Sequence, residues 1–425
     1  MEEDIVKRTK TSWRQGAAET VKTLLFWLIL AGAVGIVCGV AGGAFHLAVS
    51  GVATVRRNHS WLLYLLPFAG LLIVWTYRVW GMENDSGTNQ IIASVRSEER
   101  PPLKLAPLIF LSTVLTHLCG GSAGREGAAL QIGGSLASGM GKLLRLDERS
   151  MQVMVMCGMS GLFSALFGTP LTAAVFSMEV VSVGVFHYSA LFPGLLSAYA
   201  ATGVTRLLGI EPEHYHLMGK PELGWLPMVK VGGLAIICAL LSILFCVVMH
   251  NSFHLYKRYI PNQYYRVLVG GIVVVLFTLL EGSGDYNGAG GHIIEGALAG
   301  SVAVPWAFLL KMVFTALSLG AGFRGGEIVP TFFVGATFGC AVAPLLGLNP
   351  AFGAAIGMIA MFCGVVNCPM ASMLLSVELF GSEAILFFAM ACALSYLLSG
   401  KFSLYSSQKI VYSKLEPKFI NEHAH

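Results

Sequence analysis

Charge is scarce in this chain of 425 residues. Asp, Glu, Lys and Arg together make up 12% of it, whereas 55% of the residues are hydrophobic and the mean hydropathy is +0.71. This composition is too apolar for a soluble protein of such length. It indicates an integral membrane protein with several spans, whose function is carried out within the lipid bilayer.

The local motifs of enzymes are also missing. The sequence contains no HExxH, no GxSxG and no paired Asp constellation, so neither a metal-dependent hydrolase nor a serine hydrolase is indicated. It has no nucleotide-binding loop, so transport should need no ATP. We therefore expect no enzymatic activity, no cofactor, no metal site and no nucleotide or nucleic-acid partner.

Cysteine occurs nine times, nearly always inside apolar runs and never as CxxC. Such cysteines are typical of small core residues, and we expect no disulfide framework. Residues 1–22 are polar and mixed in charge, and the first apolar run is longer than a signal-peptide core, so we expect it to remain as a span. Basic residues gather near both ends, which favours two cytoplasmic termini. A bacterial inner (plasma) membrane is the expected location.

Glycine, by contrast, is plentiful, with 50 residues, and it divides the apolar runs into pieces of unequal length. The runs cover 24–55, 61–80, 105–118, 151–185 and 190–208, and the pattern then starts again after a polar linker. Three matching pairs are each 199 positions apart: Gly158 and Gly357, Pro170 and Pro369, Glu179 and Glu378. We expect a lead at 1–22, a first membrane repeat at 23–210, a linker at 211–226, a second repeat at 227–412 and a tail at 413–425. Paired broken helices of this kind build ion sites at the bilayer midplane.

One polar stretch stands out, GGSAGREGAALQIGG at 120–134. Arg125 and Glu126 lie there between two apolar runs, where ionisable groups are expensive and mark an ion or substrate pathway. Glu126 would begin a helix, and its carboxylate could be displaced by an anion that competes for the same free amides. The alternative is a capping carboxylate paired with Arg125 at a solvated helix end.

Two further loop-to-helix breaks offer backbone amides. The counterpart of the first stretch in the second repeat is GAGFRGGEIVP at 320–330, and an SGTN sequence lies at 86–89. Each places small residues before a new apolar helix, so each presents N–H donors to an anion.

These motifs resemble those of the CLC family of anion channels and anion/proton antiporters. The resemblance rests on GREGA at 124–128, where the family has GREGP, on GGEIVP at 325–330, its GGxFxP, and on Tyr405 in LYS at 404–406. It covers essentially the whole chain. It implies an all-α polytopic membrane fold of two inverted repeats with many tilted and broken helices, and a homodimer with one pathway per subunit.

Departures from the chloride-type pattern are similar to the fluoride-exporting branch of that family. Asn89 stands in the first motif, Glu327 in the second, and Val180 occupies the position where chloride/proton antiporters carry a second internal glutamate. Because fluoride is small and strongly hydrated, a site that strips its water must return hydrogen-bond donors. The amide of Asn89 and the hydroxyls of Thr88 and Tyr405 are expected donors.

The expected function is fluoride/proton antiport that exports fluoride, with Glu126 as the gating and proton-coupling carboxylate and Tyr405 facing the central anion, as the resemblance implies. Glu327 is expected to act as a proton relay or a filter, with helix capping as its alternative. The remaining anion-binding residues expected are Gly124, Arg125, Gly127, Ile328 and Val329. Chloride/proton antiport, or passive anion conduction on the same fold, remains the competing function.

Overall fold

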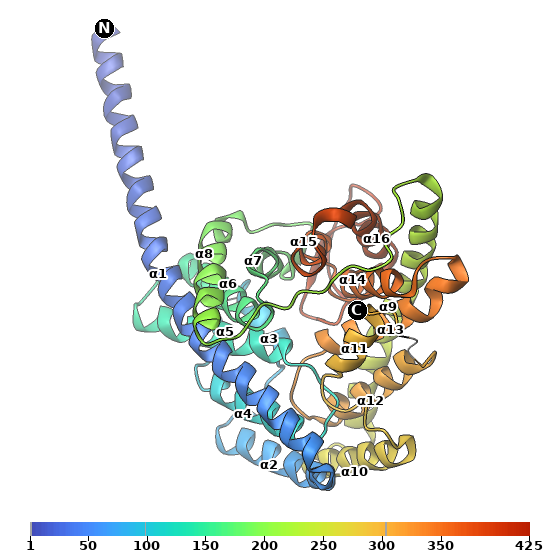
Figure 1. Cartoon of the computed structure of the whole chain (residues 1–425). Helices are drawn as coiled ribbons and strands as arrows, with labels where there is room; N and C mark the ends of the chain where they lie inside the picture. The colour runs from blue at the N-terminus through green and yellow to red at the C-terminus, as the bar shows by residue number, and fades with distance from the viewer. Residues whose placement is uncertain (1, 98, 302–303) are drawn as a thin grey trace.

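The computed structural model describes residues 2–97, 99–301 and 304–425. Within these ranges, eight α-helices precede a long connecting segment and eight follow it (Figure 1). The first set comprises α1 (Glu2–Asn58), α2 (Leu66–Val79), α3 (Thr88–Ser94), α4 (Leu105–Leu118), α5 (Glu126–Leu143), α6 (Glu148–Phe167), α7 (Pro170–Glu179) and α8 (Leu191–Leu207). The second comprises α9 (Trp225–Tyr259), α10 (Gln263–Glu281), α11 (Gly291–Leu298), α12 (Ala307–Ala321), α13 (Ile328–Val342), α14 (Pro350–Val366), α15 (Pro369–Phe380) and α16 (Ile385–Leu398). Short 3₁₀ turns lie at Ser60–Leu65, Tyr188–Ala190, Ala343–Leu346 and Ser382–Ala384.

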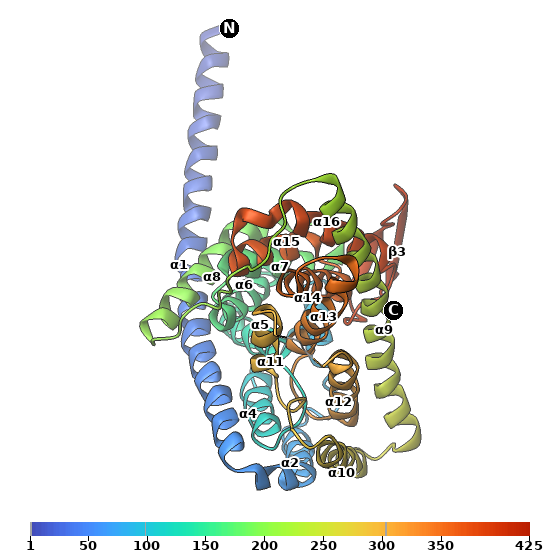
Figure 2. The same ribbon diagram turned by 45° about the vertical axis from the view of Figure 1, so that its right-hand side comes forward.

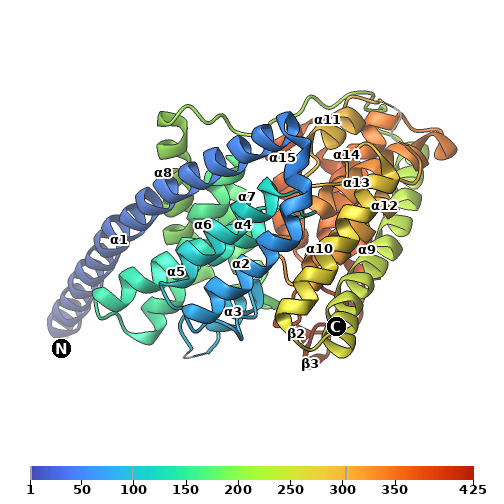
Figure 3. The same cartoon turned by 90° about the horizontal axis from the view of Figure 1, so that it is seen from below.

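The two sets repeat the same order of long and short helices, from α1 and α9 through to α8 and α16. Six helical stretches in the described ranges are long and apolar enough to cross a membrane: Glu19–Asn58, Ser60–Val79, Glu148–Phe167, Trp225–Tyr259, Gln263–Glu281 and Ile328–Leu346. Several others are apolar but shorter than a full span, as the sequence predicts. Figure 3 shows both termini at the lower edge of the molecule and the segment between α8 and α9 along the upper edge. The all-α membrane fold is therefore confirmed.

Proline fixes where the broken helices restart. Gly168 and Asn367, both with positive φ, end α6 and α14, and Pro170 and Pro369 then occupy the first positions of α7 and α15. Proline suits that position because the first helical amide has no partner within the helix. The carboxylates at the far ends of α7 and α15 cap these starts reciprocally. Glu378 accepts bonds from the amides of residues 171 and 172 at 3.0 and 2.8 Å, and Glu179 accepts bonds from those of 370 and 371 at 3.1 and 2.8 Å. Both glutamates therefore have structural roles that tie the two repeats together.

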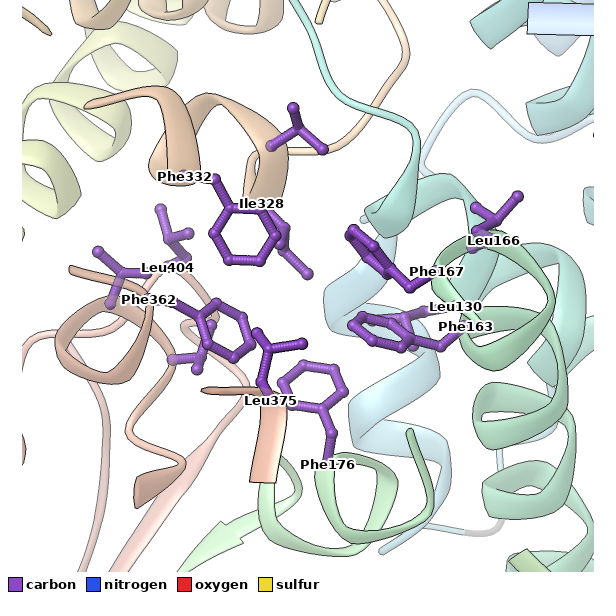
Figure 4. Close-up of a cluster of buried hydrophobic side chains, with 14 of the residues drawn as sticks. Leu130, Phe163, Leu166, Phe167, Phe176, Ile328, Phe332, Phe362, Leu375 and Leu404 are labelled. Carbon is purple, nitrogen blue, oxygen red and sulfur yellow. The ribbon is translucent and has the colours of Figure 1, made fainter. Parts of the chain in front are cut away.

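Aromatic side chains fill the seam between the repeats (Figure 4). A closed set of ring contacts, with centroids 4.9 to 5.8 Å apart, passes through five buried phenylalanines. Three come from the first repeat and two from the second: Phe163, Phe167, Phe176, Phe332 and Phe362. Ring pairs at such distances add packing energy beyond their buried area. The seam joins α6 and α7 of the first repeat to α13 and α14 of the second.

The polar lead expected at 1–22 continues directly into the first long apolar segment, because α1 runs unbroken from Glu2 to Asn58 and no proline interrupts it. One detail differs from the sequence-based prediction. The chain contains a small sheet, in which β1 (Ser182–Val183) pairs parallel with β2 (Lys409–Tyr412) and β2 pairs antiparallel with β3 (Phe419–His423). Figure 2 shows β3 at the edge of the molecule beside the C-terminus. Each strand is too short for alternation to reveal it in the sequence.

The nine cysteines are all buried, as expected for small core residues. α9 begins at Trp225, two residues before the predicted start of the second repeat at 227.

Candidate functional site

The site is built where the starts of α5 and α13 meet. Gly124 and Gly326, which precede these helices, exchange two backbone hydrogen bonds: the Gly124 amide donates to the Gly326 carbonyl at 2.7 Å, and the Gly326 amide donates to the Gly124 carbonyl at 2.8 Å. A methyl group on Gly326 would lie 2.4 Å from the Gly127 nitrogen, so only glycine fits this crossing. The two polar stretches singled out in the sequence are therefore in direct contact.

Helix geometry leaves free amides on both sides of this crossing. In α5 the first backbone amide that donates a hydrogen bond to the carbonyl four residues earlier is that of Ala129, and in α13 it is that of Thr331. The preceding amides, at 126–128 and at Ile328 and Val329, therefore lie at open helix ends, where N–H groups and the helix dipole favour negative charge. Two such ends converge here.

Glu126 occupies this junction and is fully buried. Its Oε2 accepts a hydrogen bond from the Arg125 amide at 3.0 Å, and its Oε1 lies 3.5 Å from Arg125 Nε. No hydrogen bond reaches Oε1 from the residues that the structure describes. The carboxylate is thus inside the protein, with one oxygen bonded to the Arg125 amide and the other without a hydrogen bond. It is not at a solvated helix end, as the alternative interpretation required.

Arg125 has three partners. Its guanidinium pairs with Glu126, lies 3.0 Å from Glu213 Oε1 through Nη2, and lies 3.1 Å from His46 Nδ1 through Nη1. With these partners its first role is to hold the loop before α5.

Two cavities approach the junction from different parts of the chain. The larger, of about 860 Å³, is lined by Arg125, Glu213, Val329, the end of α1 and the loop before α11. The smaller, of about 510 Å³, is lined by Thr88, Asn89, Glu327, Tyr405 and the last turns of α9, close to the C-terminus. Glu126 lines neither cavity. α1 thus ends at the first cavity and α9 at the second, as an inverted repeat requires.

The predicted donors in the smaller cavity are present but not all free. The Tyr405 hydroxyl is buried without a hydrogen-bond partner among the described residues. The Asn89 carbonyl oxygen accepts bonds from the Ser407 amide and hydroxyl, each at 3.0 Å, which leaves its NH₂ group for another acceptor. The Thr88 hydroxyl instead donates to the Gly127 carbonyl at 3.2 Å. The Gly124 amide is likewise occupied, by its bond to Gly326. These two predicted donors are engaged within the protein.

Glu327 precedes α13 and lines the smaller cavity. Its side chain makes no capping hydrogen bond to that helix, contrary to the alternative role considered for it. Its Oε2 instead lies near Gly127, 3.5 Å from where a β-carbon on that residue would stand.

The chain is similar to known membrane proteins in both sequence and structure. The family described as "Voltage gated chloride channel" matches residues 69–400. The chain belongs to this family. A chloride/fluoride channel protein from Pseudomonas syringae pv. tomato is 37% identical over 396 residues, covering 91% of this chain and 87% of the relative. A crystal structure of a CLC-type fluoride/proton antiporter superposes with a TM-score of 0.88 at 31% identity, over 91% of this chain and 98% of the other. A slow cyanobacterial Cl⁻/H⁺ antiporter gives 0.74 at 18% identity, covering 88% of this chain and 94% of the other, a likeness of fold alone.

Membership in the voltage-gated chloride channel family places the chain among membrane channels and transporters, and not among enzymes. It also confirms the resemblance inferred from GREGA and GGEIVP. The structure adds contacts that the motifs did not reveal: Gln131 Nε2 donates to the Thr88 hydroxyl at 3.3 Å, Glu213 pairs with Arg125, and Asp85 pairs with Arg324 at 3.1 Å. Arg324 also lies over a tyrosine ring, 4.1 Å from its centroid. Only the unusual charge of Asp85 and Arg324 within glycine-rich loops could have drawn attention to this pair.

Proposed function

We propose that this CLC-family protein exchanges fluoride for protons across the membrane and exports fluoride from the cytoplasm. The observation that carries the proposal is the buried Glu126 carboxylate, which stands where two helix N-termini converge and lines neither of the two cavities that approach this junction. An anion at that position would be stabilised by the same free amides that now face the carboxylate.

The mechanism follows from that competition. In its ionised form Glu126 occupies an anion position and blocks passage. Protonation removes its charge, so the side chain leaves the amides and an anion takes its place. Since one carboxyl alternately carries a proton and yields to an anion, the two ions move in opposite directions.

Selectivity for fluoride is supported by the polar groups of the smaller cavity. The NH₂ group of Asn89 and the hydroxyl of Tyr405 offer donors that replace lost hydration there. The amides of Gly127, Ile328 and Val329, at the two helix starts, would add further donors at the junction. The Pseudomonas relative, described as a chloride/fluoride channel protein, is consistent with either halide. The structural neighbour described as a fluoride/proton antiporter favours fluoride.

Glu327 is proposed as a proton relay between the smaller cavity and Glu126, or as a filter against larger anions. Its exposure to that cavity and its approach to Gly127 support the relay. Such a relay would serve in place of the internal glutamate that Val180 excludes.

We further propose that both termini face the cytoplasm, so that the smaller cavity opens inward and the larger outward. The two ends of the chain lie on one side of the molecule, which is compatible with this placement (Figure 3). A bacterial plasma membrane and a homodimer with one pathway per subunit complete the proposal. The exposed leucines, isoleucines and tryptophans of α2, α9 and α10 supply the apolar surface that lipid or a second copy would cover.

The test is ion efflux from proteoliposomes loaded with equal fluoride and chloride, with internal pH followed at the same time. We expect fluoride efflux much faster than chloride efflux, coupled to proton uptake, and loss of the proton movement in Glu126→Gln. Chloride-dominated efflux would refute fluoride selectivity, anion flux without a pH change would indicate a channel, and proton transport that persists in Glu126→Gln would refute the gate.

A further inference from the structure

The segment that connects α8 to α9 is fastened over the larger cavity by backbone hydrogen bonds to both repeats. The Glu213 amide donates to the Phe167 carbonyl at the end of α6, at 3.0 Å, and the Tyr215 amide donates to the Leu379 carbonyl in α15, at 2.8 Å. Glu213 and Tyr215 both line that cavity. The position of the Glu213 side chain is therefore set by bonds to two rigid helices, although it belongs to an irregular segment.

Glu213 and Glu126 share one cation. Arg125 reaches Glu213 Oε1 through Nη2 at 3.0 Å, but its nearest approach to Glu126 Oε1 is 3.5 Å, through Nε. The first distance is a charge-assisted hydrogen bond, whereas the second is an ion pair with no hydrogen bond to that oxygen. The Arg125 guanidinium therefore makes its shorter contact with Glu213 of the connecting segment and its longer contact with Glu126.

Several titratable and charged groups line the cavity beside this carboxylate pair. Arg56 and Arg57 lie at the end of α1, Glu211 and His214 lie in the connecting segment, and Asp285 and His292 lie around the start of α11. The Tyr215 hydroxyl donates to Glu213 Oε2 at 3.4 Å, Glu295 of α11 lies on the same cavity wall, His46 of α1 contacts Arg125, and His117 of α4 also lines the cavity. Arg125 forms an ion pair with each of the two carboxylates. Burial raises the pKa of Glu213, and Arg125 opposes that rise.

We propose that Glu213 is a positioning residue that holds the Arg125 guanidinium away from Glu126 and so sets how readily the gate takes up a proton. The inference rests on the proposed gating role of Glu126. If Arg125 paired with Glu126 alone, the ionised Glu126 carboxylate would be stabilised in its blocking position. By drawing the guanidinium toward the connecting segment, and by its own negative charge, Glu213 makes the blocking form easier to protonate and release.

Removing the Glu213 charge has a defined consequence. In Glu213→Gln the Arg125 side chain loses its charged partner and turns to Glu126, and the like charge that opposed ionisation of the gate disappears. Both changes favour ionised Glu126. A single nearby charge shifts carboxyl titration by about 1–3 pH units, so we expect the pH at half-maximal anion flux to fall by at least about one unit. Glu213→Asp should shift it in the same direction by less, since the shorter side chain keeps the charge but withdraws it from Arg125.

The experiment measures the pH profile of anion flux in proteoliposomes for the wild type, Glu213→Gln, Glu213→Asp and a control, Glu211→Gln. The control removes a carboxylate from the same segment and the same cavity wall, but this carboxylate makes no ion pair with Arg125 in the part of the chain that the structure describes, so the midpoint should stay in place. Flux is followed for whichever anion moves, so an error in the fluoride assignment does not affect the result. Unchanged midpoints in both Glu213 variants would overturn the proposal, even if the maximal rate falls, because a merely structural role lowers rates without moving the midpoint.

A second readout needs no transport. The infrared band of a protonated carboxyl that is absent in Glu126→Gln reports the gate directly in detergent-solubilised protein. We expect this band to titrate at lower pH in Glu213→Gln by the same margin of about one unit. If the band shifts while flux proves uncoupled from protons, the role of Glu213 stands and the antiport mechanism fails; if the band does not shift, the role of Glu213 fails by itself.

Discussion

The crossing of Gly124 and Gly326 makes a strong prediction about function, because it has no room for one added methyl group. In Gly326→Ala the new β-carbon would lie 2.4 Å from the Gly127 nitrogen and 3.2 Å from the Glu126 nitrogen. Ordinary contacts begin at 3.4 Å, so the two backbones must separate by about 1 Å. The atoms displaced are the amides that face the anion position.

The magnitude follows from two terms. Separation breaks the two bridge hydrogen bonds, which contribute about 1–3 kcal/mol of stability together. A displacement of about 1 Å at reacting groups lowers rates on the order of 100-fold. We expect a modest fall in thermal stability and a much larger fall in transport.

The assay is fluoride efflux from proteoliposomes with an ion-selective electrode, together with thermal unfolding in detergent. Gly203→Ala is the matched control, since Gly203 lies in α8 with nothing within 4 Å of its added methyl group, and alanine favours helix more than glycine does. Efflux in Gly326→Ala within twofold of the wild type would refute the claim that this crossing positions the site.

Three further predictions concern stability. Glu378→Gln should lower the free energy of unfolding by about 1–3 kcal/mol, measured by thermal or chemical unfolding in detergent, because it weakens two bonds from helix-start amides, and Glu179→Gln should cost a similar amount. Asp85→Asn should cost about 3–5 kcal/mol in the same measurement, since it leaves Arg324 without its buried counterion; a cost below 1 kcal/mol would mean that the pair is dispensable. Burial lowers the pKa of Lys414 to about 8 from its ordinary 10.5, so the folded state binds fewer protons between these values and stability should rise with pH across that window; the rise should vanish in Lys414→Met, followed by melting temperature against pH.

Local signals in the sequence predicted the breaks that build the site. Glycine before Glu126 and proline at 170 and 369 fixed helix starts that the structure has at the same residues. These signals work because positive φ and a missing amide act on the backbone within a few residues. The repeat could be found for the same reason, since equal spacing of such signals needs no knowledge of packing.

Contacts between distant segments could not be predicted in this way. Arg125 and Glu213 are 88 positions apart, and the Asn89 side chain is fixed by Ser407, 318 positions away. Sequence reasoning identified Thr88 as a donor to the anion because its residue type and place in the motif fitted. Only the packing of α3 against α5 shows that its hydroxyl already donates to Gly127. Residue type limits what a group can do, while its neighbours decide whether it is free to do it.

The two repeats are alike in backbone but not in charge, and this difference gives the site its direction. Glu126 and Glu327 hold equivalent positions at the starts of α5 and α13, yet the residue before Glu126 is Arg125 and the residue before Glu327 is Gly326. Glu126 is therefore buried beside a cation, whereas Glu327 lines the smaller cavity and forms no ion pair within the part of the chain that the structure describes. A perfectly symmetric pair would load protons equally from both sides. Under the proposed exchange, with one carboxylate sealed at the crossing and the other in contact with one cavity, protons would enter through Glu327 from the side of the two termini and would be released past Arg125 toward the connecting segment.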